Sequence, residues 1–396
     1  MASWLTQNLT SFDRVSLFAF WLSLAVLFYV YIGYPCLLAL VSMFFKRAKL
    51  EPTHTPSVSV LISAYNEEQN IRKKIDETLS LNYPPSEFDV VVASDGSTDK
   101  TDEIVRSIGN PRVRLVRIEG RRGKTRAQNE AVQVCHGEII VFSDATTTYH
   151  PDALRHLAAN YQDPKVGAVS GRYKYFEAKG NSPTALGTIT FWNYENAIKL
   201  LQSRINTITG CCGCIYSVRK NIYTNLEDDV ISDLVQPLKA IEKGYLVLFE
   251  ENALAYEETT QTTREEFKMR VRVATRGIRG ILSVRDLLKP WLHAWVSFQL
   301  FSHKILRWLV AFFLLTLLLS NAFLLDRLLF RVSFVCQIVF YLLALIAFVI
   351  PLHRKWKLLG VPLYFCTLNL AAFVSVIQVS RGEKYAVWET VRTSSQ

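Results

Sequence analysis

The chain has 396 residues, of which 50% are hydrophobic, and its formal net charge is +10. This length fits roughly two domain-sized units. The charge does not indicate a nucleic-acid-binding protein, because much of it lies beside apolar segments and no basic run is interleaved with aromatic residues. The seven cysteines do not form the pattern of a disulfide framework, so a small secreted fold is also excluded.

A long apolar run follows a short N-terminal tail, residues 1–14. Residues 15–45 are almost uncharged and read VSLFAFWLSLAVLFYVYIGYPCLLALVSMFF. About 20 apolar residues in a helix cross a hydrocarbon core of about 30 Å, so this run suffices for one transmembrane helix. It is too long, and has the wrong pattern, for a cleaved signal peptide.

Three further transmembrane helices are predicted near the C-terminus, at residues 305–325, 332–352 and 361–380. The segment 291–304 before them is aromatic and flanked by lysines, which is typical of a helix that lies in the membrane interface. Basic residues follow the first and third spans, and they predict that both joints are cytosolic: Lys46, Arg47, Lys49, Arg354, Lys355 and Lys357.

These spans predict a multi-pass protein of the inner or plasma membrane whose soluble domain is cytosolic. Four spans would put both ends of the chain outside the cell. The tail 381–396 is slightly basic, which favours the opposite side. Both placements of the tail stay open at this point.

Residues 52–290, between the membrane segments, have the composition of a soluble domain. Apolar β-rich runs at 58–64, 89–94, 113–118 and 138–143 alternate with helical patterns at 66–81, 99–108 and 126–134. Such alternation predicts an α/β fold with a parallel sheet that helices cover on both faces. Ligands of these sheets bind at the carboxyl ends of the strands.

Polar residues follow three of the predicted strands at that edge. They read Tyr65-Asn66-Glu67, Asp95-Gly96-Ser97 and Asp144-Ala145-Thr146. Three such strand ends predict a binding site. Helices at 191–204 and 233–243 come later, the second closed by Gly244. Cys211, Cys212 and Cys214 lack a partner CxxC pair, so a zinc site is not expected.

Four segments of this domain carry a specific resemblance. LISAYNEEQNI, VASDGSTDKT, GKTRAQNEAV and FSDATTTYHPDAL match, in order and spacing, the donor half of inverting family-2 glycosyltransferases with a Rossmann-like GT-A fold. The arrangement of one N-terminal and several C-terminal spans resembles the membrane polysaccharide synthases of that family, which make hyaluronan, chitooligosaccharide or poly-N-acetylglucosamine. The resemblance covers residues from about 57 to 280.

The resemblance implies which residues bind the nucleotide and the donor sugar: Ala64, Tyr65, Glu67, Asp95, Lys124, Asp144 and Arg272. Other roles stay open for several of them. Glu67 also suits the positive end of a helix, Asp95 also suits a turn, and Lys124 also suits a solvated basic loop.

The family's DxD motif, which binds Mg²⁺ or Mn²⁺ on the donor phosphates, falls at Asp144. Here the motif reads Asp-Ala-Thr, so Thr146 replaces the second acid. A hard cation that keeps several waters needs only one or two carboxylates. The resemblance therefore implies a metal site at Asp144 and Thr146, completed by the diphosphate and water.

The acceptor half resembles the family less closely. ITGCCGCIYSVRK is similar to its Thr-Gly-x-x-Gly segment, with Thr209, Gly210 and Gly213 on the acceptor side. Counting back from Gly244-Tyr245 matches Asp233 to the family's catalytic acid, which would take the proton from an acceptor hydroxyl. The alternative is that Asp229 is the base and Asp233 only caps a helix.

The family's Q/RxxRW element corresponds to residues 269–273. Arg272 matches the arginine that meets the diphosphate, whereas Val273 stands where relatives have tryptophan. The missing tryptophan makes a processive synthase less expected. A membrane-surface role for the basic face of Arg270, Arg272 and Arg276 is the alternative.

The expected function is metal-dependent transfer of a sugar from a UDP-sugar onto a growing polysaccharide. Two alternatives stay open: transfer of a single sugar to a lipid, and a catalytically weak nucleotide-binding subunit of a synthase. With four spans, a conduit for the polymer would require a homo-oligomer or an export partner, besides the lipid bilayer itself.

Overall fold

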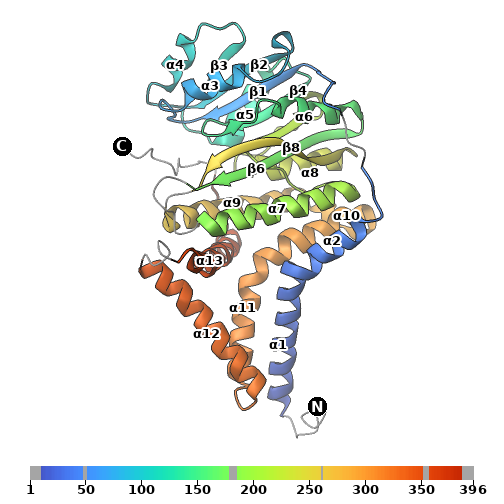
Figure 1. Ribbon diagram of the computed structural model, residues 1–396, viewed down its shortest axis with the longest axis vertical. Helices are drawn as coiled ribbons and strands as arrows, with labels where there is room; N and C mark the ends of the chain where they lie inside the picture. The colour runs from blue at the N-terminus through green and yellow to red at the C-terminus, as the bar shows by residue number, and fades with distance from the viewer. Residues whose placement is uncertain (1–9, 48–50, 178–184, 260–261, 351–355, 386–396) are drawn as a thin grey trace.

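The computed structural model describes residues 10–47, 51–177, 185–259, 262–350 and 356–385. A domain of strands and helices lies at one end of the molecule, and long helices extend from its base to the other end (Figure 1). The predicted basic residues Lys49, Arg354 and Lys355, and the tail beyond residue 385, lie outside the described residues.

The domain is built on one mixed sheet with the strand order β3-β2-β1-β4-β7-β6-β8-β5. The strands are β1 (Val58–Ala64), β2 (Phe88–Asp95), β3 (Val113–Ile118), β4 (Ile139–Asp144), β5 (Thr148–Tyr149), β6 (Val166–Phe176), β7 (Ile215–Arg219) and β8 (Leu246–Glu258). β1 is parallel to both β2 and β4, and β2 is parallel to β3, so the predicted parallel sheet is confirmed. β7 then runs antiparallel to β4.

Helices cover both faces of this sheet. They are α3 (Ile71–Leu79), α4 (Thr101–Ser107), α5 (Lys124–Val134), α6 (Ala153–Ala159), α7 (Ala185–Ile205), α8 (Ser232–Glu242) and α9 (Thr263–Ser283). Val60 and Ile62 of β1 pack into the core on one face, whereas Leu61 packs into the core on the other. This two-sided burial is why the strand has a continuous apolar sequence.

The first predicted helix, at 66–81, begins only at Ile71. The residues before it form a loop that binds the neighbouring strand end. Asn66 has a positive φ of 52°, and its side-chain oxygen accepts a hydrogen bond from the Thr98 amide at 2.8 Å. The Glu67 amide donates to the Thr101 hydroxyl at 2.8 Å. Hydrogen bonds therefore connect the loop that follows β1 to the loop that follows β2.

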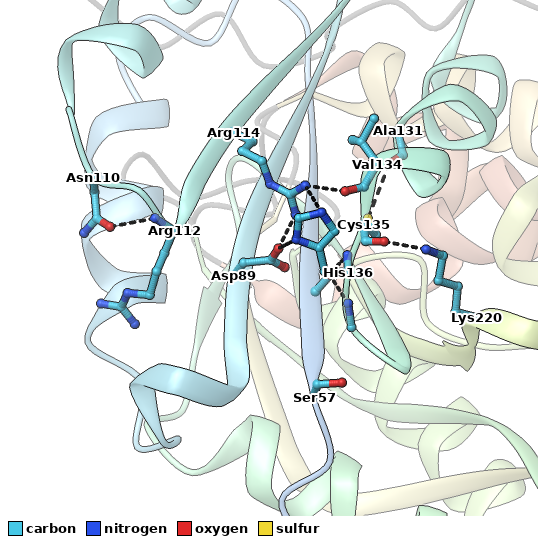
Figure 2. Close-up of polar contacts among 12 residues, drawn as sticks. Ser57, Asp89, Asn110, Arg112, Arg114, Ala131, Val134, Cys135, His136 and Lys220 are labelled. Carbon is cyan, nitrogen blue, oxygen red and sulfur yellow. Dashed lines mark hydrogen bonds and ion pairs between the residues drawn. The ribbon is translucent and has the colours of Figure 1, made fainter.

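A separate polar cluster lies at the amino ends of β2 and β3, away from the carboxyl ends of the strands (Figure 2). Arg114 at the start of β3 binds the Asp89 carboxylate and the Val134 carbonyl, and its Nη1 atom lies 3.1 Å from Nε2 of His136. The Lys220 ammonium donates to the Cys135 carbonyl at 2.5 Å. These contacts tie the end of α5 to the sheet, far from the carboxyl ends of the strands.

The remaining helices are α1 (Ser11–Phe28), α2 (Tyr34–Ser42), α10 (Pro290–Leu300), α11 (Leu306–Ala322), α12 (Leu328–Val349) and α13 (Gly360–Ser380). The π-helical turns η2 (Tyr29–Gly33) and η7 (Phe301–Ile305) join α1 to α2 and α10 to α11. By length and composition, four of the described helices can cross a membrane: Ser11–Ser42, Pro290–Ala322, Leu328–Val349 and Gly360–Ser380. The segment 291–304, predicted as a separate interface helix, is continuous here with the span predicted at 305–325, apart from non-helical backbone angles at His293.

α13 differs in orientation from the other long apolar helices. α1, α11 and α12 are seen along their length, whereas α13 is foreshortened and lies just below α9 (Figure 1). The hydroxyl of Tyr364, near its start, accepts a hydrogen bond from Arg270 of α9 at 2.8 Å. Gln378, near its end, accepts one from Thr275 of α9 at 3.2 Å. Both ends of α13 therefore contact α9, at the base of the domain that contains the sheet.

Candidate functional site

A cavity of about 300 Å³ opens at the carboxyl ends of β1 and β4, where the sequence predicts a site. We call it the donor cavity. Seven of the predicted site residues line it: Glu67, Lys124, Asp144, Thr146, Gly213, Asp233 and Arg272. Segments that are far apart in the sequence thus converge on one space.

Asp144 ends β4, and Lys124 begins α5 directly after Gly123, whose φ is 98°. The Lys124 ammonium forms an ion pair with the Asp144 carboxylate. Burial alone would lower the pKa of Lys124, but the charge of Asp144 and this hydrogen bond outweigh burial and raise that pKa. Lys124 is therefore a charged residue that an ion pair holds in the cavity. The alternative that it lies in a solvated basic loop is wrong.

Glu257 supplies a second carboxylate that the sequence analysis did not identify. It lies near the end of β8 and lines the donor cavity with Asp144. The Thr146 hydroxyl donates to Oε1 of Glu257 at 3.0 Å. Burial, and then repulsion from the Asp144 charge, raise the pKa of Glu257 to about 8. The cavity thus contains two carboxyl groups and the Thr146 hydroxyl, although the Asp-Ala-Thr sequence has only one acid.

This set of oxygen ligands fits a hard divalent cation. Mg²⁺ usually takes one or two carboxylates from the protein and completes its shell with phosphate and water oxygens. The described residues contain no cluster of three or more His, Cys, Asp or Glu side chains suited to a metal. Two carboxylates and a hydroxyl fit a cation that shares its ligands with a bound diphosphate.

Asp95 ends β2, as the sequence predicts, but lies outside the donor cavity. Its side chain is buried, and its two oxygens accept hydrogen bonds from the backbone amides of Arg122 and Gly123, each at 2.8 Å. It thereby fixes the loop that presents Lys124. The Tyr65 ring lies under the Arg121 guanidinium, 4.1 Å from the ring centre. Asp95, Tyr65 and the buried Ala64 do not line the donor cavity, and their contact with a nucleotide stays a prediction.

Asp233 lies in the first turn of α8 and lines the donor cavity together with Asp144. Its Oδ2 atom is 2.6 Å from the position that a Cβ on Gly213 would occupy, so only glycine leaves room for this carboxylate. Burial raises the pKa of Asp233, against the lowering effects of the Lys124 and Lys199 charges. A carboxylate with a raised pKa is a stronger base, as the predicted role requires.

Asp229, the alternative base, is occupied elsewhere. Its carboxylate forms an ion pair with Arg279 at 2.6 Å, and it does not line the donor cavity. The geometry therefore favours Asp233 over Asp229.

The three arginines of α9 have separate partners. Arg276 is buried and donates to the Thr125 hydroxyl at 2.8 Å, and burial lowers its pKa to about 10. Arg270 binds Glu266 at 2.7 Å. Arg272 lines the donor cavity. Arg270 and Arg276 also line this cavity and are bound within the protein, so the alternative of a membrane-surface role is wrong for both.

A second cavity, of about 430 Å³, adjoins the first, and we call it the acceptor cavity. Residues that line both cavities are Trp192, Ile231, Asp233, Arg270 and Val273. Gly210 lines the acceptor cavity, whereas Thr209 is buried beside it and lines neither.

Two tryptophans stand near Val273, where the family pattern has one. Trp192 of α7 lines both cavities, and Trp308 of α11 lines the acceptor cavity. A ring carbon of Trp308 is 3.1 Å from the position that a Cβ on Gly277 would take, so this glycine admits the indole ring. Neither tryptophan is indicated by the family motif in the sequence, because the motif lies in α9 whereas these residues lie in α7 and α11.

Comparisons with known proteins show which families and folds this chain resembles. Residues 59–226 match the family model described as Glycosyl transferase family 2. The chain is 28% identical over 240 residues to a poly-beta-1,6-N-acetyl-D-glucosamine synthase of Staphylococcus epidermidis, a match that covers 59% of this chain and 58% of the relative. It is 26% identical over 247 residues to the Staphylococcus aureus protein of the same name, covering 60% and 58%.

The chain therefore spans less than two thirds of the length of these curated relatives. Among solved structures, it is similar to a mannosyltransferase from Pyrobaculum calidifontis in complex with GDP-Man and Mn²⁺. That likeness has a TM-score of 0.66 at 22% identity and covers 91% of this chain and 98% of the other. Residues 59–226 thus match the model of glycosyltransferase family 2, and the chain has the GT-A fold, accompanied by helices long and apolar enough to cross a membrane.

Proposed function

We propose that this chain transfers a sugar from a nucleoside diphosphate donor to an acceptor hydroxyl at a membrane surface, with inversion at the sugar carbon. The observation that carries this proposal is the position of Asp233, which lines both cavities. A base at this junction can contact an acceptor in one cavity while the donor occupies the other.

In the proposed reaction, the Asp233 carboxylate accepts the proton of the acceptor hydroxyl while the oxygen attacks C1 of the sugar. Attack comes from the face opposite the departing diphosphate, which gives inversion. Lys124 and Arg272, on the donor side, stabilise the negative charge that develops on the leaving group.

Asp144, Thr146 and Glu257 would hold Mg²⁺ or Mn²⁺, which would neutralise charge on the diphosphate. The Pyrobaculum structure contains Mn²⁺, which supports a divalent cation without selecting between the two. We keep a UDP-sugar as the proposed donor on the resemblance to the synthases. The GDP-Man in the Pyrobaculum structure makes GDP-sugars the comparison to include.

The proposed location is the inner or plasma membrane, with several spans and a cytosolic catalytic domain. The apolar helices and the Staphylococcus relatives support it. The names of these relatives make a growing saccharide the first acceptor to test, whether or not a lipid carries it.

The test uses the full chain in vesicles with radiolabelled UDP- and GDP-sugars, and measures nucleoside diphosphate release and sugar transfer. Asp233→Asn should lower turnover at least about 100-fold while nucleotide binding persists. Asp286→Asn is the matched control, because Asp286 is an exposed carboxylate paired with Lys289 outside both cavities. Wild-type turnover in Asp233→Asn would contradict the proposal, and nucleotide binding without any transfer would favour a regulatory subunit.

A further inference from the structure

The acceptor cavity is walled mostly by apolar side chains from helices at the base of the catalytic domain. They come from α7, α8, α9, α11 and α13, and include Phe191, Leu234, Val273, Trp308, Phe365 and Leu368. α11 and α13 belong to segments long and apolar enough to cross a membrane. Apolar side chains of two candidate membrane-spanning segments therefore form part of the cavity wall.

The same cavity contains more positive than negative charge. Its basic lining residues are Lys199, Arg270, Lys304 and Arg307, and its acidic ones are Glu195 and Asp233. Arg307 forms an ion pair with Glu195. Arg270 forms an ion pair with Glu266, which is buried and does not line the cavity. Two lysines thus remain without a carboxylate partner within this lining.

Lys199 and Lys304 both lie close to the proposed base. The Lys199 ammonium is 3.1 Å from Sγ of Cys212, in the loop that contains Gly213. The Lys304 ammonium lies 4.0 Å from the position of a Cβ on Gly210, in the same loop. No side-chain hydrogen bond or ion pair to Lys304 occurs within the part of the chain that the structure describes.

An anionic group between these two ammonium groups would gain charge-assisted hydrogen bonds. A neutral saccharide would leave both ammonium groups without an ion-pair partner in this largely apolar wall, where burial of an unpaired charge is costly. Phosphate matches the site, because lysine binds it as a point charge and a phosphodiester has two non-bridging oxygens, one for each ammonium group.

We propose that the acceptor is a lipid that bears a phosphate group, with its hydrocarbon chain along α11 and α13 and its phosphate at Lys199 and Lys304. This inference rests on the proposed function and names the acceptor class for the same site. The reacting hydroxyl of the lipid headgroup, or of a saccharide linked to it, lies at Asp233. Its oxygen bonds to C1, the bond from C1 to the diphosphate oxygen breaks, and its proton goes to Asp233. The lipid phosphate is unchanged by the reaction and serves as an anchor.

The test places the full chain in phosphatidylcholine vesicles with a radiolabelled nucleotide sugar and one added acceptor at a time. Phosphatidylglycerol and a polyisoprenyl diphosphate saccharide are the two phosphate-bearing lipids, diacylglycerol is the lipid without phosphate, and a free chitooligosaccharide is the acceptor without lipid. Label should enter the organic phase at least about tenfold more with one of the phosphate lipids than with diacylglycerol.

Which phosphate lipid is labelled identifies the source of the phosphate. Equal labelling of diacylglycerol, or label only in the free saccharide, would overturn the inference and leave the transferase proposal intact. Absence of nucleoside diphosphate release with every acceptor would instead contradict the proposed function itself.

Substitutions give an independent readout. Lys304→Gln should raise the KM for the labelled lipid about tenfold, and Lys304→Arg should recover most of that loss. Lys199→Gln is the second variant, used also if Lys304→Gln does not fold. Lys289→Gln, in an exposed ion pair with Asp286, is the matched control and should leave this KM unchanged. An unchanged KM for the lipid in both cavity variants would overturn the assignment of the phosphate site.

Discussion

Oδ2 of Asp233 lies 2.6 Å from the place where a Cβ on Gly213 would stand. The loop that contains Gly213 is also bound to α8 through its backbone, since the Cys211 amide donates to the Asp233 carbonyl at 2.8 Å. The absence of a side chain on Gly213 therefore helps to set the direction in which the Asp233 carboxylate points.

Gly213→Ala should lower kcat by about tenfold to 100-fold, because the added methyl group displaces the Asp233 carboxylate from the cavity junction. The KM for the nucleotide sugar should change much less. Steady-state kinetics of purified chain in vesicles measure both. Gly109→Ala is the control, since its φ of 62° strains the backbone but its Cβ meets nothing within 4 Å. Equal losses of kcat in the two variants would indicate a general loss of stability instead.

Asp229→Asn should lower stability by about 1–3 kcal/mol, because it leaves Arg279 without its charged partner in a mostly buried place. Its kcat should stay within about twofold of the wild type, in contrast to Asp233→Asn. Thermal unfolding and turnover measured on the same preparation separate the two effects. Loss of turnover in Asp229→Asn with a functional Asp233→Asn would reverse the assignment of the base.

Glu257 should make cation binding depend on pH. Its folded-state pKa of about 8 means that it is largely protonated at neutral pH without a cation. A cation requires the charged form, so the affinity for Mn²⁺ should rise as the pH increases from about 6 to 8. Isothermal titration calorimetry with Mn²⁺ at several pH values measures this affinity. Glu257→Gln should flatten the profile, and a steep profile in that variant would refute the assignment.

The same shift predicts how stability depends on pH in the absence of a cation. The pKa of Glu257 is raised in the folded state, from its usual 4.5 to about 8, so the folded state binds this proton more tightly than the unfolded state. The stabilisation is complete below pH 4.5 and is lost as the pH rises through 8. Tm should therefore fall over this window, Mn²⁺ should restore it, and Glu257→Gln should show a smaller fall. A Tm that rises over this window only in the wild type would contradict the sign.

The end of α13 should lie on the same side of the membrane as the catalytic domain, because Tyr364 and Gln378 both bind α9. In sealed vesicles, a membrane-impermeant maleimide should label Lys384→Cys from the same side as Ser107→Cys, which lies in α4. It should label Asp326→Cys, which lies between α11 and α12, from the other side. The exposed Cys36 and Cys336 are first replaced by serine. Labelling of Lys384→Cys together with Asp326→Cys would instead support the four-span topology predicted from hydropathy.

The parallel half of the sheet was predictable because its signals are local. The runs 58–64 and 113–118 coincide with β1 and β3, and Gly244 ends α8 with the expected positive φ of 85°. The polar residues after β1 and β4 share one cavity for the same reason, since parallel strands end at one edge.

Other features depend on long-range packing, which a sequence pattern does not contain. Glu257 shares a cavity with Asp144 because β8 pairs with β5, which follows Asp144 closely in the chain. Lys199 and Lys304 converge from two helices that give no joint sequence signal. The direction of α13 was not predictable because hydropathy reports length and composition, whereas tilt is set by neighbouring helices.

The boundary between the donor and acceptor cavities consists of side chains shared by both, among them Trp192, Ile231 and Val273. No strand of the sheet has to move for the size of this opening to change. Point substitutions at these three positions can therefore widen or narrow the range of molecules that are glycosylated while the scaffold stays constant. Relatives with the same fold can diverge in product through a few side chains, and the same positions offer a compact starting set for engineering.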